Sequence, residues 1–341
     1  MTIEYTTASW NPLVGCSPVS TGCAHCYAAR EAGTRLAHLA DYKDCTTKRT
    51  RLIDRLDDTA SGDDHAVHHA FNGKIVVREK LIEAPLRKTS PQRYFVCSTS
   101  DMFHANVPGG VRDRMLAVML LSPWHTYLVL TKRPHVAHWY LTDLTLYARV
   151  LEHANALRSV RPGLTSVGVS NPSSPLAPWI WWGVSAENKK EFESRVYWLR
   201  MLPVARRLLS LSPLLEEIDL DGQLCSFKNA NGDRPKIDWV ILEGESGPDA
   251  RPCDLRWLSR MLASCKEQGV PAYLKQLGDN PTDSISEAAG GARYVGRLGR
   301  GGRDEQSWPE ELRNNKNLPM FWQPESQYGA RLSKASRKGE K

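Results

Sequence analysis

The chain has 341 residues, of which 41% are hydrophobic, and its formal net charge is +7. No apolar run is long enough to predict a membrane span, and the N-terminal residues lack the basic-then-apolar order of a secretory signal. Eight cysteines in a chain of this length are too sparse for a disulfide framework, so we expect a soluble cytoplasmic protein with no membrane partner.

Short apolar runs rich in β-branched and aromatic residues predict strands, the first of them around residues 5–10. Further strands are predicted at 74–77, 93–97, 126–130, 179–184, 206–211, 239–242 and 272–274. Helical patterns lie between them at 110–121, 136–158, 189–202 and 255–268. Alternating strands and helices predict a parallel sheet covered by helices, and the number of strands favours a complete or partial (β/α) TIM-type barrel.

Three segments interrupt this alternation. Residues 40–72 are predicted to be a polar insertion, 159–178 a loop, and 279–341 a Gly-, Arg- and Pro-rich extension that is only partly ordered. We therefore predict a barrel domain over 1–278, with the insertion at about 40–72, followed by a C-terminal extension over 279–341. Much of the positive charge lies in that extension, which indicates either a solvated tail or a nucleic-acid partner.

Polar side chains gather directly after the predicted strands. All strands of a parallel barrel point the same way, so these side chains should converge on the face where such folds place their active sites. Turn, capping and ion-pair roles are the structural alternatives. The candidate site residues are Ser98, Ser100, Asp101, Lys132, Ser185, Glu243, Glu245 and Lys275.

Three cysteines, Cys16, Cys23 and Cys26, lie close together in the stretch GCSPVSTGCAHC. Thiolates at this spacing can turn inward on a loop and bind one metal centre. A structural zinc would need a fourth ligand such as His25 or His104, and a redox pair would leave one cysteine without a role. An iron–sulfur cluster uses all three cysteines, so we favour it over zinc, redox thiols and unrelated core cysteines.

Three clustered cysteines after the first strand of a barrel resemble the radical S-adenosylmethionine (radical SAM) superfamily. The usual spacing there is Cys-x3-Cys-x2-Cys, whereas this chain has Cys-x6-Cys-x2-Cys. The chain is more closely similar to a phage and bacterial radical-SAM-like three-Cys-motif family, a domain of unknown function. The similarity lies in ASWNPLVGCSPVSTGCAHCYA, RYFVCSTSDMFHANVP, HTYLVLTKRP, IWWGVSAE, LSPLLEEIDL, DWVILEGESGPDARP and PAYLKQLG. Family members tend to carry a glutamate where this chain has Ser212.

This resemblance implies that Cys16, Cys23 and Cys26 hold a [4Fe–4S] cluster and that S-adenosyl-L-methionine chelates its fourth iron. An external electron donor would reduce the cluster, and cleavage of the sulfonium would start radical chemistry on a substrate. The resemblance further implies that the strand-end residues bind this cofactor. Asp101 and Glu245 are the preferred partners of its ammonium group, because each is an acid.

The substrate implied by the resemblance is DNA or a nucleotide, in modification or repair. The cations Lys132, Arg133, Arg251 and Arg256 near the expected mouth are compatible with phosphates. The resemblance also implies a three-Cys-motif partner protein and a place in the cytoplasm of a bacterial cell or a phage-infected host. The alternative is a zinc-stabilised nucleic-acid-binding protein of a phage or defence complex, without radical chemistry.

Overall fold

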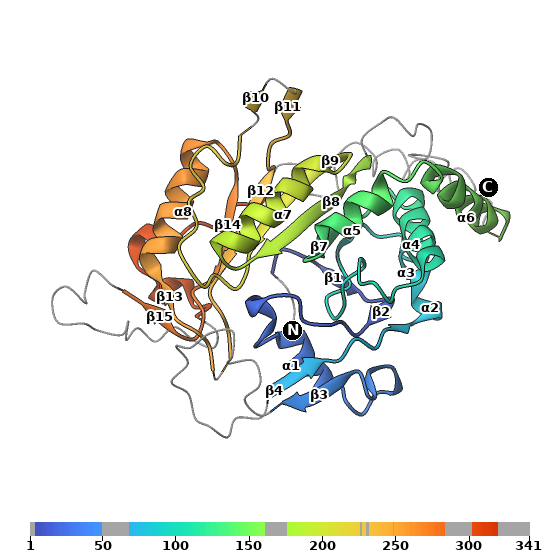
Figure 1. Ribbon diagram of the computed structural model, residues 1–341, viewed down its shortest axis with the longest axis horizontal. Coiled ribbons are helices and arrows are strands. Elements are labelled where there is room, and N and C mark those ends of the chain that lie inside the picture. The colour runs from blue at the N-terminus through green and yellow to red at the C-terminus, as the bar shows by residue number, and fades with distance from the viewer. Residues whose placement is uncertain are drawn as a thin grey trace.

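The computed structural model describes residues 4–49, 68–160, 176–225, 227–229, 232–247, 249–283 and 302–319. Its centre is a sheet in the order β1-β6-β7-β8-β9-β12-β14, in which every pair of neighbours is parallel. These strands are Ala8–Trp10, Arg93–Val96, Thr126–Thr131, Leu176–Ala186, Val204–Leu211, Trp239–Glu243 and Ala272–Gln276. The sheet forms half of a barrel (Figure 1), so the α/β barrel prediction is confirmed in its partial form.

The longer helices follow the strands and lie around the outside of the sheet (Figure 1). They are α4 (Gly109–Leu121), α5 (Pro134–Leu141), α6 (Leu146–Val160), α7 (Lys189–Met201) and α8 (Leu255–Glu267). The helix predicted at 136–158 is therefore two helices. The Asp143 side chain accepts hydrogen bonds from the backbone N–H and the hydroxyl of Thr145, and such local bonds compete with a continuous helix. No helix in the described ranges is long and apolar enough to cross a membrane.

The core has two layers because successive strand residues point to opposite faces. Trp182 packs in the large cluster between sheet and helices, while its neighbour Trp181 belongs to a second cluster inside the half barrel. Tyr5 closes that inner cluster, with its ring centroid 5.6 Å from Trp239 and 5.4 Å from Tyr273. The inner layer thus fills part of the half barrel with side chains of which many are aromatic.

The predicted barrel strand at 74–77 is wrong. Only Val76–Val77 form a strand, β5, which pairs antiparallel with β2 (Leu13–Val14) outside the main sheet. Both residues of β5 are only half-buried, whereas the central barrel strands β7 and β12 are buried at nearly every position. The predicted insertion contains the antiparallel strands β3 (Thr46–Arg49) and β4 (His68–Phe71), which lie beside α1 (Tyr27–Gly33).

The remaining short elements connect these parts. They are η1 (Thr21–Cys23), η2 (Ala40–Tyr42), α2 (Glu79–Ile82), α3 (Ala84–Arg87), β10 (Phe227–Asn229), β11 (Gly232–Arg234), β13 (Cys253–Asp254), β15 (Pro281–Thr282), η4 (Glu305–Ser307) and η5 (Glu310–Leu312). Residues 50–67 of the predicted insertion, 161–175 of the predicted loop, and 284–301 and 320–341 of the predicted extension lie outside the described residues.

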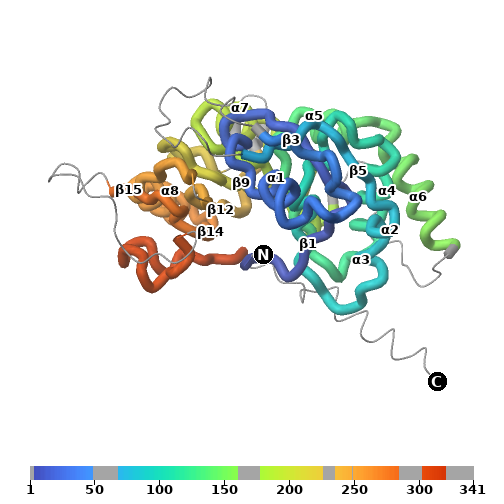
Figure 2. The backbone as a smooth tube through the Cα atoms, turned by 90° about the horizontal axis from the view of Figure 1, so that it is seen from below, coloured from blue at the N-terminus to red at the C-terminus, as the bar shows by residue number. Residues whose placement is uncertain are grey.

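Residues 302–319 pack against the barrel, although they belong to the predicted extension. Trp308 is fully buried in the main core cluster. The Leu274 N–H donates to the Asn315 carbonyl, so the segment runs along β14 at the edge of the sheet. Figure 2 shows it (red) reaching from α8 toward the N-terminus, where Lys316 pairs with Glu4 at 2.9 Å.

Candidate functional site

The carboxyl ends of all the strands of the parallel sheet open into one cavity of about 520 Å³. Residues in or directly after each strand line it, including Asn11 after β1, Ser185 in β8 and Gln276 in β14. The structure also brings together every predicted site residue at this cavity. They are Cys16, Cys23, Cys26, Ser98, Ser100, Asp101, Lys132, Ser185, Glu243, Glu245 and Lys275.

The three clustered cysteines lie on one loop of the cavity wall. Cys16 follows β2, Cys23 ends η1, and Cys26 is the N-cap of α1. All three are free thiols and half-buried. They share one cavity, but the described part of the chain holds no group of three or more His, Cys, Asp or Glu side chains arranged to bind a metal ion.

A fourth cysteine of the cavity, Cys97, is absent from the predicted site. It follows β6, lines the same cavity and is buried. Its backbone has a φ of 57°, a left-handed conformation that is unusual for a residue with a side chain and costs free energy. Its N–H donates to the Trp10 carbonyl, which holds this turn against β1. The sequence places Cys97 at the end of the strand predicted at 93–97, far along the chain from the other three cysteines.

The charges around the cysteine loop change the pKa values of its thiols in opposite directions. Burial and the nearby Asp101 raise the pKa of Cys16 to about 12, although the Arg133 guanidinium donates to its Sγ at 3.6 Å. Burial also acts to raise the pKa of Cys23, but the Lys132 ammonium and backbone hydrogen bonds from Val19 and Ser20 together outweigh it, and the pKa is lowered. Cys23 is therefore the more readily ionised of these two thiols.

Asp101 is occupied by donors from the protein itself. Its two oxygens accept hydrogen bonds from the Thr131 hydroxyl, from the backbone N–H of Phe103 and of Lys132, and from Arg133 at 3.0 Å. The side chain is almost completely buried. The geometry thus makes Asp101 the group that positions Arg133, rather than an open partner for a ligand's ammonium group.

Glu187 joins the cysteine loop to the sheet and was not among the predicted site residues. Its carboxylate accepts a hydrogen bond from the Gly22 N–H at 3.0 Å and pairs with Lys132 and Arg195, each at 3.1 Å. Burial acts to raise its pKa, but these two cations lower the pKa to about 2. Glu187 comes shortly after the strand predicted at 179–184, which is the signal that could have found it.

Glu245 is likewise held by the protein. The Arg251 guanidinium donates from Nε at 2.9 Å and from Nη2 at 2.6 Å, one bond to each carboxylate oxygen, and His25 Nδ1 lies 3.0 Å from Oε2. Burial opposes ionisation, but the bonds from Arg251 and His25 lower the pKa of Glu245 to about 2. This carboxylate is ionised and fixed, with bidentate geometry of the strong kind.

Comparison with known proteins places the chain in a family. The sequence model of the family described as "Protein of unknown function (DUF5131)" matches residues 1–317. The chain belongs to this family. No curated protein and no solved structure matches it. The radical SAM resemblance and the cofactors that it implies stay predictions.

The serines of this DUF5131 protein mostly donate to neighbouring protein groups. Ser98 donates to Asn11 Oδ1 at 3.1 Å, Ser100 to the Gly15 carbonyl and Ser185 to the Ser212 carbonyl at 3.0 Å. Beside Ser212, Glu243 pairs with Lys275 and accepts a hydrogen bond from the Ser212 hydroxyl. The side chain of Ser212 thus donates to Glu243.

The cations expected at the mouth of the DUF5131 cavity are neutralised by carboxylates. Lys132 pairs with Glu187, Arg133 with Asp101, Arg251 with Glu245 and Arg256 with Asp254. A phosphate would have to compete with these ion pairs. The geometry therefore does not support direct phosphate contact by these four residues.

The two histidines considered as zinc ligands are engaged elsewhere. His104 Nε2 lies 2.8 Å from the Ser17 hydroxyl, and its Nδ1 accepts from the Asn106 N–H. His25 contacts Glu245 and stacks on His68 with ring centroids 5.1 Å apart. Neither histidine joins the cysteines in a zinc-like ligand group within the described ranges.

Proposed function

We propose that this protein is a radical SAM enzyme that acts on nucleic acid or nucleotides. The observation that carries the proposal is that three free cysteines share one cavity with polar side chains from the carboxyl ends of the parallel strands. A [4Fe–4S] cluster bound there would supply, with S-adenosyl-L-methionine and an external electron donor, one-electron cleavage of the sulfonium. The three-Cys-motif partner protein stays a prediction from the resemblance.

The residues present suit a cluster by their chemistry. Cys16, Cys23 and Cys26 would hold it, because soft thiolates are the usual protein ligands of iron–sulfur centres. Lys132 and Arg133 add positive charge beside the loop and favour the thiolate form of Cys23 and Cys16, respectively. Glu187 fixes both Lys132 and the loop backbone, and so holds this charge in place.

The cofactor's amino-acid and ribose groups need polar partners, and side chains that line the same cavity offer them. Ser98, Ser100 and Ser185 can accept hydrogen bonds from hydroxyl or ammonium groups while they donate to the protein. Glu243 and Lys275 form a pair that can meet an ammonium and a carboxylate. Asp101 and Glu245 act indirectly in this scheme, because they position Arg133 and Arg251.

Anaerobic purification of the full chain tests the proposal. We expect a brown protein with about four irons per chain that cleaves S-adenosyl-L-methionine when it is reduced. Cys23→Ala should lose both the iron and the cleavage. Cys225→Ala, which removes a half-buried thiol outside the cavity, is the matched control and should retain both.

Zinc content decides between this proposal and its alternative. A colourless wild-type protein with about one zinc per chain and no cleavage would contradict the radical SAM proposal and favour the zinc-stabilised nucleic-acid-binding protein. Retention of iron by Cys23→Ala would contradict the assignment of the three cysteines as ligands.

A further inference from the structure

Four aromatic side chains gather on the outer surface of α5 and α7, away from the cysteine cavity. They are His135, Trp139, Tyr197 and Trp198, called the aromatic platform below. Trp139 is 61% exposed and Tyr197 59% exposed, which is unusual for large aromatic residues. The two helices lie side by side, as Figures 1 and 2 show.

The rings of the platform meet edge to face. The ring centroids of His135 and Trp139 are 5.3 Å apart at 81°, those of Trp139 and Trp198 are 6.4 Å apart at 71°, and those of Tyr197 and Trp198 are 5.4 Å apart at 81°. An edge-to-face contact uses the edge of one ring and leaves its flat faces uncovered by that partner. Each such contact covers at most one face of a ring, and the high exposure of Trp139 and Tyr197 leaves much of their apolar ring surface open to the solvent.

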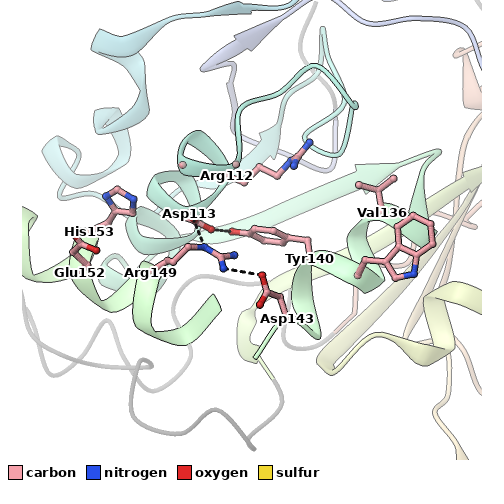
Figure 3. Close-up of a pocket in the computed structure, with 11 residues that line it drawn as sticks. Arg112, Asp113, Val136, Tyr140, Asp143, Arg149, Glu152 and His153 are labelled. Atoms are coloured by element: carbon pink, nitrogen blue, oxygen red, sulfur yellow. Dashed lines mark hydrogen bonds and ion pairs between the residues drawn. The ribbon is translucent and has the colours of Figure 1, made fainter. Parts of the chain in front are cut away.

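The platform stands on a rigid support. The Tyr140 hydroxyl donates to Asp113 at 2.8 Å, and Arg149 donates to Asp113 at 2.9 Å and to Asp143 at 2.8 Å. Figure 3 shows these bonds, which join α4, α5 and α6 around a second cavity of about 570 Å³. Trp139 also lines this cavity, and its helix is bonded to α4 through Tyr140 and, by way of Asp143 just after it, to α6 through Arg149.

Both helices of the platform begin at the rim of the cysteine cavity. The first residue of α5 follows Arg133 directly, and Arg133 lines that cavity. The N-cap of α7 is Asn188, whose side chain lies 3.4 Å from the Thr21 hydroxyl in the cysteine loop. His135, in the first turn of α5, therefore links the rim to the exposed ring of Trp139.

We propose that the aromatic platform binds a single-stranded segment of nucleic acid by base stacking, on the outer surface of the two helices that begin at the rim of the cysteine cavity. The proposal rests on the proposed function for its substrate class. A chain of net charge +7 attracts a polyanion, while Lys132, Arg133 and Arg251 are already paired with carboxylates. Stacking on exposed rings thus provides the contact that those paired cations do not, and it is available only to unpaired bases.

Fluorescence anisotropy of a labelled 20-nucleotide mixed-sequence DNA strand, titrated with the full chain, tests this proposal. Trp139→Ala and Tyr197→Ala are each expected to weaken binding by roughly fivefold or more, the lower end of the loss of one base stack. Trp139→Phe should retain most of the affinity because it keeps a ring, whereas Trp139→Leu should not. Leu144→Ala, at a residue that is 97% exposed in the adjacent turn, is the control and should bind like the wild type.

Several outcomes would overturn the platform proposal. They are unchanged binding by both alanine variants, equal affinity of Trp139→Leu and the wild type, and equally tight binding of the corresponding duplex. If the wild-type protein cleaves S-adenosyl-L-methionine but does not bind the DNA strand, the platform proposal is overturned and the radical SAM proposal is not. Ring-dependent strand binding by a protein without iron or cleavage would support the platform and contradict the radical SAM function.

Discussion

The Glu187 carboxylate lies where a side chain on Gly22 would have to be. A Cβ built on Gly22 would come within 2.6 Å of the Glu187 Cδ and 2.7 Å of the Lys132 Nζ. The absence of a side chain lets the loop backbone donate directly to Glu187, which is fully buried. The position of the loop between Cys16 and Cys23 therefore depends on one glycine and one acid that are far apart in the sequence.

Gly22→Ala is expected to displace the cysteine loop and to lower the free energy of unfolding by about 1–3 kcal/mol, the usual cost of overpacking a filled site. Under the proposed function, its iron content after anaerobic purification should fall as well. Urea unfolding and iron analysis measure the two effects. Gly110→Ala is the control, because a Cβ there meets no atom within 4 Å. Equal stability and iron content in the two variants would contradict the close approach at Gly22.

Arg251→Met is expected to destabilise the protein by about 3–5 kcal/mol, since it leaves the Glu245 carboxylate buried without its bidentate partner. Adding Glu245→Gln to Arg251→Met should recover part of that loss, because the uncompensated charge is then removed. A double-mutant cycle by chemical denaturation measures the coupling between them. If the effects of the two substitutions are additive, the ion pair between Arg251 and Glu245 contributes nothing to the free energy of unfolding.

The parallel half barrel was predictable because its strands are short, apolar and rich in β-branched or aromatic residues. The stretch WIWWGVSAE illustrates this, since it is buried on both faces and carries near its end Ser185, which lines the cavity. The convergence of the strand-end residues follows from parallel topology alone. The strand predicted at 74–77 was wrong because a short apolar run does not reveal which sheet it joins.

The partners of the site residues could not be predicted. Glu187 and Gly22 meet only because β8 ends beside the cysteine loop, and a single sequence does not encode that proximity in any local pattern. The same holds for Cys97, which looked isolated along the chain. Trp139 and Trp198 lie on different helices, and their contact depends on how α5 and α7 pack. Each of these features is a product of tertiary structure.

Trp308→Ala tests whether the segment after the barrel is part of its core. The indole is fully buried and donates from Nε1 to the Gly302 carbonyl at 2.9 Å. We expect a loss of about 3–5 kcal/mol in the free energy of unfolding, as for other buried tryptophans. Leu144→Ala at the protein surface should change stability by less than about 0.5 kcal/mol. A similarly small loss in Trp308→Ala would show that the segment does not contribute to the stability of the barrel.

We expect His125 to make the stability of the protein depend on pH, in the range between the ordinary pKa of a histidine and the pKa of His125 in the folded protein. Burial lowers the pKa of this imidazole from 6.5 to about 4, and its ring is held neutral between the Gln92 N–H and the Pro85 carbonyl. The unfolded chain therefore takes up the proton first. The contribution of the neutral His125 side chain to the free energy of unfolding is fully present above pH 6.5. It decreases as the pH falls to about 4, by about 3 kcal/mol in total.

Unfolding free energies measured by urea denaturation across this pH range test the assignment. His125→Gln removes the titrating group, so its stability should fall less steeply than that of the wild type as the solution is acidified. His38→Gln, at an exposed histidine, should keep the wild-type slope. If His125→Gln and the wild type lose stability in parallel from pH 6.5 to 4, the neutral buried imidazole at this position is ruled out, since no other group is removed by the substitution.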